Sequence, residues 1–194
     1  SDHPDAKSRW DFEVSDSLED ALTGADFVII SILPATFKEM RSDVHLPERL
    51  GIWQSVGDTA GPGGMIRALR TIPVLREFAE DMEEVCPDAI FLNYTNPMAM
   101  LTGFMQRYTK VKTVGLCHSV QCCASSLLQT LGMDMSLLDG HKELIAGINH
   151  MAWLLEITDT KGNDLYPEIA RRAKAKNAAR KHSDMVRFDY IDKL

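Results

Sequence analysis

Hydrophobic positions along the chain form two kinds of segment, short continuous runs and longer stretches with helical spacing. The short runs predict strands at residues 10–14, 27–33, 89–94, 112–117, 145–148 and 152–157. The longer stretches predict helices at residues 17–22, 65–85, 98–107, 120–131, 165–179 and 184–193. Because strands alternate with helices, the pattern indicates βαβ units and a parallel sheet.

Local residues mark where several of these elements begin and end. Ser17 is placed to cap the first helix, whose first turn is acidic, and Gly24 follows its end. The uninterrupted apolar run at 27–33 predicts a strand that is buried on both faces, and Pro34 closes it. Pro97 lies at the first turn of a later helix.

The order of elements also suggests that part of a dinucleotide-binding fold is missing. Such a sheet opens with a G-x-G-x-x-G fingerprint after its first strand and has an acidic residue about 20 residues later. The sequence contains no G-x-G-x-x-G, and a helical pattern continues to Leu194. We therefore expect a fragment of a longer protein, or a chain whose other regions are not included.

Composition and charge exclude several classes of protein. The 194 residues are 45% hydrophobic and 25% charged, which is typical of a soluble globular protein with one domain or a domain and a half. The net charge of −7 argues against a nucleic-acid partner or an anionic membrane partner. No apolar stretch approaches the roughly 20 residues of a membrane span. Adjacent Cys122 and Cys123 make a disulfide framework improbable, so we expect a reducing, cytoplasmic compartment.

Two segments, Gly115–Ser119 and Gly147–Met151, carry the most informative chemistry. Each places a metal ligand after a short apolar run, with a thiolate at Cys117 and an imidazole at His150. Such a pair suits a transition metal, and two protein ligands leave the open positions that a catalytic metal needs. The alternative is that Cys117 is a small buried hydrophobe and His150 a hydrogen-bonded core histidine. Their separation in sequence does not decide between the two.

Other polar residues can serve either a ligand or the fold. The backbone amides of the turn Gly57–Gly64 can bind an anion or a sugar hydroxyl, or the segment can be a flexible capped turn. Asn96 can hydrogen-bond hydroxyls or a carboxamide, or it can cap the following helix. His118 can transfer a proton or bind a sugar, or it can be an ordinary polar residue at a strand end.

The polar segments Asn93–Asn96 and Cys117–His118 both follow strands of the predicted parallel sheet. Ligands of such sheets bind beyond the carboxyl ends of the strands. We therefore expect both segments to belong to one shared site.

Four segments, taken in order, resemble the family 4 glycoside hydrolases, which use NAD and a divalent metal. They are Gly57–Thr59 with Gly61–Gly64, Asn93–Met100, Gly115–Gln121 and Gly147–Ala152. The resemblance implies an α/β fold with a Rossmann-like parallel sheet, here lacking its first strands, that leads into an α+β substrate domain of the lactate/malate dehydrogenase type. It implies a partial NAD-binding domain at residues 1–117 and the start of the substrate domain at residues 118–194.

Within this family, the segments around Cys117 and His150 look most like the α-galactosidase branch. The 6-phospho-glycosidase branch typically has Asp where His118 stands, which disfavours a phosphorylated substrate. The resemblance implies that NAD oxidises the sugar at C3, the aglycone leaves by elimination across C1 and C2, water adds, and C3 is reduced again. A divalent metal, usually Mn²⁺, would act as a Lewis acid. The partners would be a small-molecule α-glycoside and further copies of the chain, in a homodimer or homotetramer.

The resemblance also assigns site residues by position. It makes Cys117 and His150 the metal ligands. The other residues that it places against substrate or cofactor are Asn96, Asn149 and Arg41 for the substrate, Ile32, Leu33, Pro34 and Asn96 for NAD, and His118 as a residue that contacts the sugar or assists the leaving group. The family's tyrosine base would lie beyond Leu194, and Tyr190 lacks the context of that base. We therefore expect these 194 residues to be inactive alone.

Three alternatives remain open at the level of sequence. The first is a related family 4 activity, on α-glucosides, α-glucuronides or α-galacturonides. The second is an NAD-dependent 2-hydroxy-acid dehydrogenase, which would need no metal and would leave the Cys117 and His150 pair without a role. The third is a fragment that binds metal or nucleotide without catalysis. Titration with manganese would separate the third alternative from the others.

Overall fold

The computed structural model describes residues 11–54 and 57–179 of the chain. The chain divides into two compact units, residues 1–116 and 117–194, and each unit is described by itself. The division lies beside the domain boundary that the sequence predicts after Cys117. No helix in the described part is long and apolar enough to cross a membrane.

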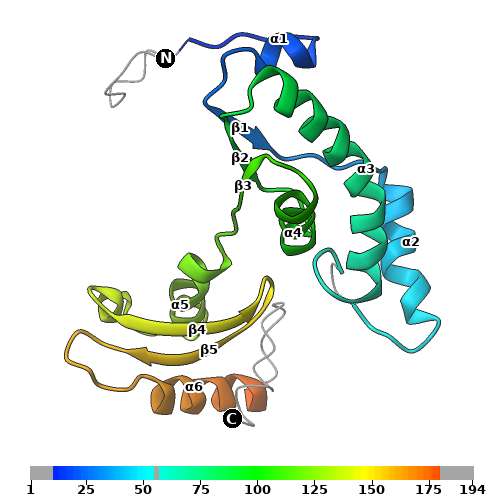
Figure 1. Ribbon diagram of the computed structural model, residues 1–194. Helices are drawn as coiled ribbons and strands as arrows, with labels where there is room; N and C mark the ends of the chain where they lie inside the picture. Colours follow the sequence, from blue (N-terminus) through cyan, green and yellow to red (C-terminus); the bar gives the residue numbers. More distant parts are fainter. Residues whose placement is uncertain (1–10, 55–56, 180–194) are drawn as a thin grey trace. The chain divides into compact units, whose positions relative to one another are not determined.

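The first unit combines a parallel sheet with helices that precede and connect its strands (Figure 1). Its elements are α1 (Leu18–Leu22), β1 (Phe27–Ile30), α2 (Phe37–Glu48), α3 (Gly61–Val85), β2 (Ile90–Asn93), α4 (Met98–Tyr108) and β3 (Lys112–Gly115). The strand order is β1-β2-β3, and both pairs are parallel. The predicted α/β architecture with βαβ connections is therefore confirmed.

The core of the first unit lies on one face of this sheet. Ile30 and Phe91 are buried there, against apolar residues of α3 and α4 that include Leu75 and Leu101. Side chains of the opposite face are exposed or half-buried, and Ile29 keeps 65% of its surface open to solvent. The prediction that the run at 27–33 is buried on both faces is wrong, because in the described chain the helices cover only one face.

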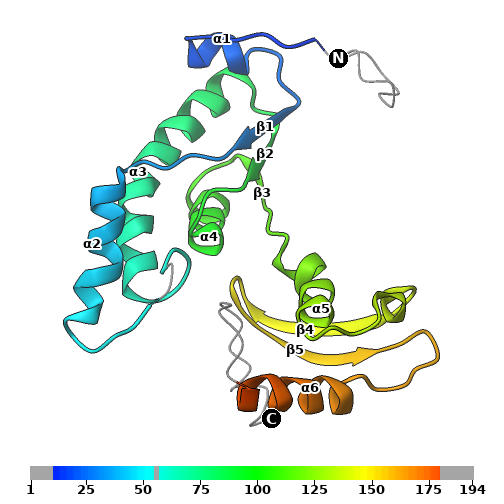
Figure 2. The ribbon, with the colours of Figure 1, turned by 180° about the vertical axis from the view of Figure 1, so that it is seen from behind.

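Helix α2 is an element that the hydrophobic pattern did not predict. Thr36 and Glu39 begin it with a capping box, in which the Thr36 side chain accepts from Lys38 N and the Glu39 carboxylate accepts from Thr36 N. The helix lies beside α3 in both ribbon views (Figures 1 and 2). The guanidinium of Arg70 on α3 donates two hydrogen bonds, of 2.9 and 2.8 Å, to the buried carboxylate of Asp43 on α2.

Other boundaries differ from those predicted. No strand forms over residues 11–14, where Phe12 and Val14 are exposed and lack a neighbouring strand, and Trp10 lies outside the described residues. Helix α3 begins at Gly61, four residues early, because Gln54 accepts a hydrogen bond from Gly63 N and so caps its first turn. The predicted helix over 184–193 also lies outside the described residues.

The second unit is an antiparallel hairpin packed against helices. Its elements are α5 (Ser119–Thr130), the 3₁₀ turn η1 (Met135–Leu138), β4 (Lys142–Ile148), β5 (Met151–Thr158) and α6 (Tyr166–Ala179). Leu128 of α5, Ile157 of β5 and Ile169 of α6 are fully buried in one core. Arg172 on α6 donates to the carbonyl of Leu131, which satisfies the end of α5. This arrangement agrees with the predicted α+β character.

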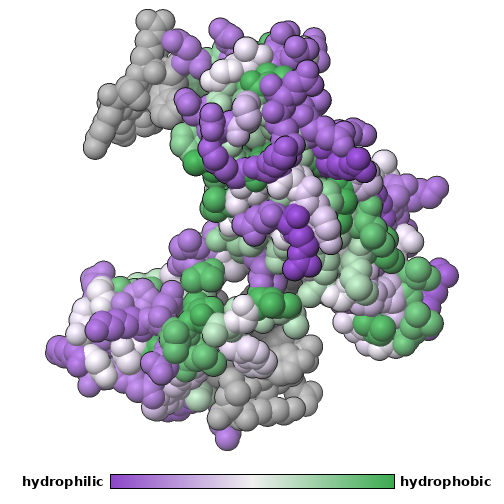
Figure 3. Space-filling view, viewed as in Figure 1, coloured by the Kyte–Doolittle hydropathy of each residue, from purple (hydrophilic) through white to green (hydrophobic). Residues whose placement is uncertain are grey.

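The hairpin buries one face and leaves the other exposed. A register shift between Leu144 and Ile145 leaves Leu155 of β5 unpaired and indicates a bulge at Leu155, so that Leu154 and Ile157, three positions apart, can both pack in the core. Figure 3 shows hydrophobic surface in the region of this hairpin. The exposed apolar side chains of its strands are Leu144, Ile148, Met151, Trp153 and Leu155.

Candidate metal and substrate site

Cys117 and His150 lie together in the second unit. The Cys117 Sγ is 3.3 Å from the His150 Nε2. Cys117 is half-buried and His150 is exposed, so His150 is not a core histidine. Sulfur and nitrogen atoms at this separation, open to solvent on one side, form the kind of pair that binds a transition metal.

The start of helix α5 surrounds the Cys117 thiol with hydrogen-bond donors. Ser119 Oγ lies 3.1 Å from the sulfur, and Ser119 N donates to it over 3.4 Å. Burial raises the pKa of Cys117, but hydrogen bonds from Ser119, Asn149 and His150 outweigh burial and lower that pKa to about 7. A thiolate is the form that binds metals, and a helix N-terminus favours it.

His150 is held in place by a tight turn. Ile148 pairs with Met151 across the hairpin, so Asn149 and His150 form a two-residue loop. The φ angle of His150 is +59°, in the left-handed region that L side chains rarely adopt. Gly147 stands at a close approach, because a Cβ there would lie 2.6 Å from Ala152 Cα. The tight turn between β4 and β5 thus places the His150 side chain beside Cys117.

Asn149 adds a third polar group beside this pair. Its side chain hydrogen-bonds to Cys117. Its Oδ1 atom is buried and has no hydrogen-bond partner within the described ranges. An unsatisfied buried oxygen next to a thiolate and an imidazole fits a site that is completed by a cation. The described residues contain no group of three or more His, Cys, Asp or Glu side chains suited to a metal.

His118 lies between Cys117 and the first residue of α5 in the sequence. Its backbone carbonyl accepts from Cys122 N, and the residue occupies the N-cap position of α5 without a capping side-chain bond. The side chain is exposed. It is thus available to a ligand, and its assignment as a sugar-contacting residue stays a prediction.

In the first unit, the carboxyl ends of β1 and β2 are joined by a hydrogen bond. Ile32 N donates to Thr95 Oγ1 over 3.0 Å. Leu33 and Pro34 follow Ile32, and Asn96 follows Thr95, so the predicted cofactor-contacting residues lie at one edge of the sheet. Their contact with NAD stays a prediction, as does a shared site with Cys117, which belongs to the other unit.

The Asn96 side chain caps α4 and meets a residue from another loop. Its Oδ1 accepts from Met98 N, the first residue of α4, over 3.2 Å, as the capping alternative expects, although Pro97 and not Asn96 is the N-cap residue. The same Oδ1 lies 3.2 Å from the hydroxyl of Thr59, which is almost fully buried. Asn96 therefore bonds the start of α4 and also lies at the edge of the sheet. Helix capping and ligand binding are thus compatible roles for this side chain.

The residues behind Thr59 were missed by the sequence analysis. Thr59 Oγ1 is 3.2 Å from Asp58 Oδ1, and Asp58 Oδ2 is 3.7 Å from the guanidinium of Arg67 on α3. Arg67 is 8% exposed, and its Nε has no hydrogen-bond partner in the described chain. The Gly-Asp-Thr motif marks the loop in the sequence, but no periodic signal identifies Arg67 as its partner.

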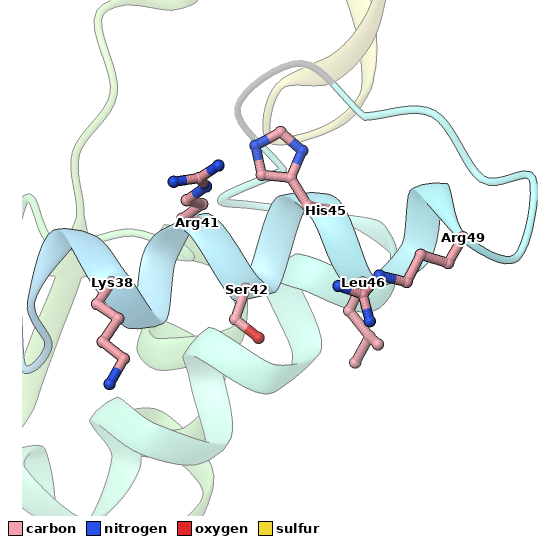
Figure 4. A pocket seen from close by; sticks show the side chains of 6 residues that line it. All are labelled: Lys38, Arg41, Ser42, His45, Leu46 and Arg49. Carbon is pink, nitrogen blue, oxygen red and sulfur yellow. The ribbon is translucent and has the colours of Figure 1, made fainter.

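Arg41 lies on the exposed face of α2 in a hollow of about 250 Å³ (Figure 4). The residues that line this hollow are Lys38, Arg41, Ser42, His45, Leu46 and Arg49. Arg41 and the Cys117–His150 pair are in different units, so its role in substrate binding stays a prediction.

Comparison with known proteins identifies the family. Residues 3–133 match the family described as family 4 glycosyl hydrolase, and residues 145–194 match the C-terminal domain of family 4 glycosyl hydrolases. An α-galactosidase of Bacillus subtilis (strain 168) is 57% identical over 175 residues, which are 90% of this chain and 39% of the relative. An α-galacturonidase of Thermoanaerobacter italicus is 49% identical over 166 residues, which are 83% of this chain and 36% of the relative. The chain thus spans less than two fifths of either relative.

Solved structures agree with this assignment. A crystal structure from Bacillus subtilis, assigned to the glucosidase lplD, superposes with a TM-score of 0.77 at 34% identity and covers 95% of this chain and 46% of the other. The 6-phospho-beta glucosidase from Thermotoga maritima, solved with manganese, NAD⁺ and glucose-6-phosphate, gives a TM-score of 0.68 at 25% identity, over 84% of this chain and 39% of the other. The family models, the parallel sheet and the similar proteins all agree. The chain therefore belongs to the family 4 glycosyl hydrolases.

Proposed function

We propose that the whole protein hydrolyses α-galactosides with the help of NAD and a divalent metal, with manganese as the first candidate. The observation that carries this proposal is the Cys117 Sγ to His150 Nε2 pair at 3.3 Å, which neither a metal-free dehydrogenase nor a purely structural module needs. The α-galactosidase relative, at 57% identity, supports the choice of sugar. Bound manganese would supply a Lewis acid, and NAD would supply a hydride acceptor.

The residues of the chain then have distinct tasks. Cys117 and His150 would hold the metal, and Asn149 would orient Cys117 through its hydrogen bond. Asn96 would contact the sugar beside the nicotinamide, and Ile32–Pro34 would lie along the cofactor. His118, exposed at the start of α5, would contact the sugar or assist the leaving group.

The decisive experiment measures hydrolysis of p-nitrophenyl α-galactoside by the full-length protein with NAD, manganese and a thiol reductant. We expect activity that is lost without NAD and lost in Cys117→Ser. Cys122→Ser, an exposed cysteine on α5, serves as the matched control and should retain activity. Activity that survives without NAD would contradict the redox mechanism. Activity that survives in Cys117→Ser would contradict the role of that residue.

A second candidate substrate is an α-galacturonide. Four cationic or titratable side chains, Lys38, Arg41, His45 and Arg49, line one hollow on α2 although the whole chain is acidic (Figure 4). A carboxylated sugar requires such positive charge, and a relative at 49% identity is named an α-galacturonidase. Comparison of kcat/KM on galactoside and galacturonide substrates decides between the two. Arg41→Ala should lower the galacturonide value more than the galactoside value, with the exposed Arg76→Ala as control.

We further propose a reducing, cytoplasmic location and a homodimer or homotetramer. All four cysteines are free thiols, and the proposed role of Cys117 requires that it stay reduced. Light scattering of the full-length protein tests the oligomeric state, and a monomer at micromolar concentration would contradict it.

A further inference from the structure

We propose that Thr59 is a positioning residue, which holds the Asn96 side chain so that Asn96 offers its Nδ2 hydrogens, and not its Oδ1, to the ligand. The inference rests on the proposed function in one respect, because it takes Asn96 to contact the sugar or the nicotinamide. It adds the hydrogen-bonding polarity of that contact and the residue that sets it.

The first step is the orientation of the Asn96 amide. The Met98 backbone nitrogen lies 3.2 Å from one terminal atom of this side chain. A backbone N–H only donates, so the atom that faces it must be the acceptor oxygen and not the amide nitrogen. The helix cap therefore fixes which end of the amide is Oδ1, and Nδ2 is the other end.

The second step is that Thr59 occupies the remaining capacity of this oxygen. A carboxamide oxygen has two lone pairs, and the Thr59 hydroxyl lies 3.2 Å from the same Oδ1 that accepts from Met98 N. With both lone pairs in use, Oδ1 has none left for a ligand hydroxyl. Within the described chain Nδ2 makes no hydrogen bond, and Asn96 is only partly buried. A ligand therefore meets a donor at this position.

The third step is that the loop holds Thr59 rigidly. Thr59 is 6% exposed, and a Cβ added at Gly64 would lie 2.7 Å from its carbonyl carbon, so the loop is packed directly onto the first turns of α3. The single hydrogen of this hydroxyl is shared in a three-centre bond between Asn96 Oδ1 and Asp58 Oδ1, each 3.2 Å from Thr59 Oγ1, and Asp58 Oδ2 lies 3.7 Å from the buried guanidinium of Arg67. Asp58, paired with Arg67, thus holds the Thr59 hydroxyl through a second contact.

The ligand atom that suits this arrangement is an acceptor. In a sugar it is a hydroxyl or carbonyl oxygen, and in a nicotinamide it is the carboxamide oxygen. A ligand that presents only N–H groups at this point would find no acceptor, because Oδ1 is satisfied within the protein. Thr59 contributes to this selection without touching the ligand.

The test is a double-mutant cycle in the full-length protein, with Thr59→Val, Asn96→Ala and the double variant. Thr59→Val keeps the shape and removes the hydroxyl. Isothermal titration with D-galactose in the presence of NAD and manganese measures affinity, and assays with p-nitrophenyl α-galactoside measure kcat and KM. We expect Thr59→Val to weaken galactose binding and kcat/KM about 5- to 10-fold. In the Asn96→Ala background it should cause no further loss.

Two further variants separate positioning from loss of structure. Thr59→Ser restores the hydroxyl and should recover affinity to within about twofold of the wild type. Thr113→Val removes another buried hydroxyl of the same unit, one that bonds the Val111 carbonyl, and should leave affinity unchanged. Additive losses in the cycle, or a Thr59→Ser variant as weak as Thr59→Val, would overturn the inference.

Failure of the proposed function would look different. If the wild type neither binds galactose nor cleaves galactosides, the sugar assignment fails, and titration with NAD⁺ alone then judges Thr59. Non-additive loss of NAD⁺ affinity in Thr59→Val and Asn96→Ala would still support the inference. Additive loss, or no binding of NAD⁺ by the wild type, would overturn it.

Discussion

At the scale of single residues, His150 occupies a left-handed position in a backbone turn and is the proposed metal ligand. Its φ of +59° is strained for any side chain with a Cβ and most strained for a β-branched one. We expect His150→Val to reduce the free energy of unfolding by about 1–2 kcal/mol relative to His150→Gly, which removes the same imidazole but accepts this φ. Both variants should lose manganese affinity equally. Urea denaturation and calorimetric titration with manganese measure the two effects.

Each of the two measurements on His150 can contradict a different expectation. Equal stability of His150→Val and His150→Gly would show that the turn carries no strain in solution. Retention of wild-type manganese affinity in either variant would remove His150 from the metal site. The glycine variant is the more informative one, because it changes the ligand and leaves the turn intact.

The sequence predicts part of this site and misses another part for physical reasons. The pairing of Cys117 with His150 follows from the family resemblance of the segments that carry them, because their separation in sequence does not by itself bring them together. Thr59 and Arg67 receive no role in this way, since a threonine after an aspartate reads as an ordinary turn residue. Their connection to Asn96 depends on how loop, α3 and α4 pack, and local sequence does not encode that packing.

At the scale of elements, Asp43 and Arg70 join α2 to α3. The carboxylate is buried, and it accepts both hydrogen bonds from a guanidinium that is 26% exposed. We expect Asp43→Asn to reduce the free energy of unfolding by about 1–3 kcal/mol, because it removes the charge-assisted bonds and leaves Arg70 partly buried. Chemical denaturation of the full-length protein measures this effect.

A solvent-exposed ion pair on the same α3 helix provides the control for Asp43→Asn. Arg76 and Glu80 are 71% and 63% exposed, and we expect Arg76→Ala to change stability by less than about 0.5 kcal/mol. A loss in Arg76→Ala as large as that in Asp43→Asn would indicate that removal of any charge pair on α3, and not the bridge between the helices, accounts for the change.

Glu168 on helix α6 makes the folding stability depend on pH. Hydrogen bonds from Arg171 and Arg172 lower the pKa of Glu168 from 4.5 to about 2. A carboxylate with a lowered pKa in the folded state stabilises it fully above about pH 4.5, and that contribution is lost as the pH falls from 4.5 towards 2. We expect the melting temperature of Glu168→Gln to change less with pH than that of the wild type within this window. Glu156→Gln, an exposed glutamate of β5, should leave this pH dependence unchanged, and an unchanged pH dependence in Glu168→Gln would contradict the expectation.

The elements themselves differ in how well sequence predicts them. Strands β2 and β3 and helices α4 to α6 follow from their apolar patterns, because those patterns reflect the burial of a single face. Helix α2 was missed because its start depends on the capping box of Thr36 and its burial on Asp43, a charged residue, while Pro47 argues against a helix. The segment over 11–14 has an apolar pattern but no neighbouring strand, and a strand requires both.

At the scale of the whole molecule, the chain has two separate cores. Leu101 in the first unit and Leu128 in the second are both fully buried, and each belongs to its own hydrophobic cluster. Leu101→Ala and Leu128→Ala remove the same atoms, and each should cost about 2–5 kcal/mol by loss of burial and by cavity formation. Because the clusters share no residue, we expect each substitution to accelerate amide hydrogen exchange chiefly in its own unit.

Hydrogen-exchange mass spectrometry of the full-length protein resolves these responses by peptide. Leu101→Ala should expose β2 and α4, and Leu128→Ala should expose α5 and the β4–β5 hairpin that carries His150. Acceleration of both units by either substitution would show that they unfold as one cooperative body in the whole protein. Separate responses would instead mean that two regions are stabilised independently. These are the Cys117–His150 pair of the second unit and the sheet edge of the first unit that carries Asn96.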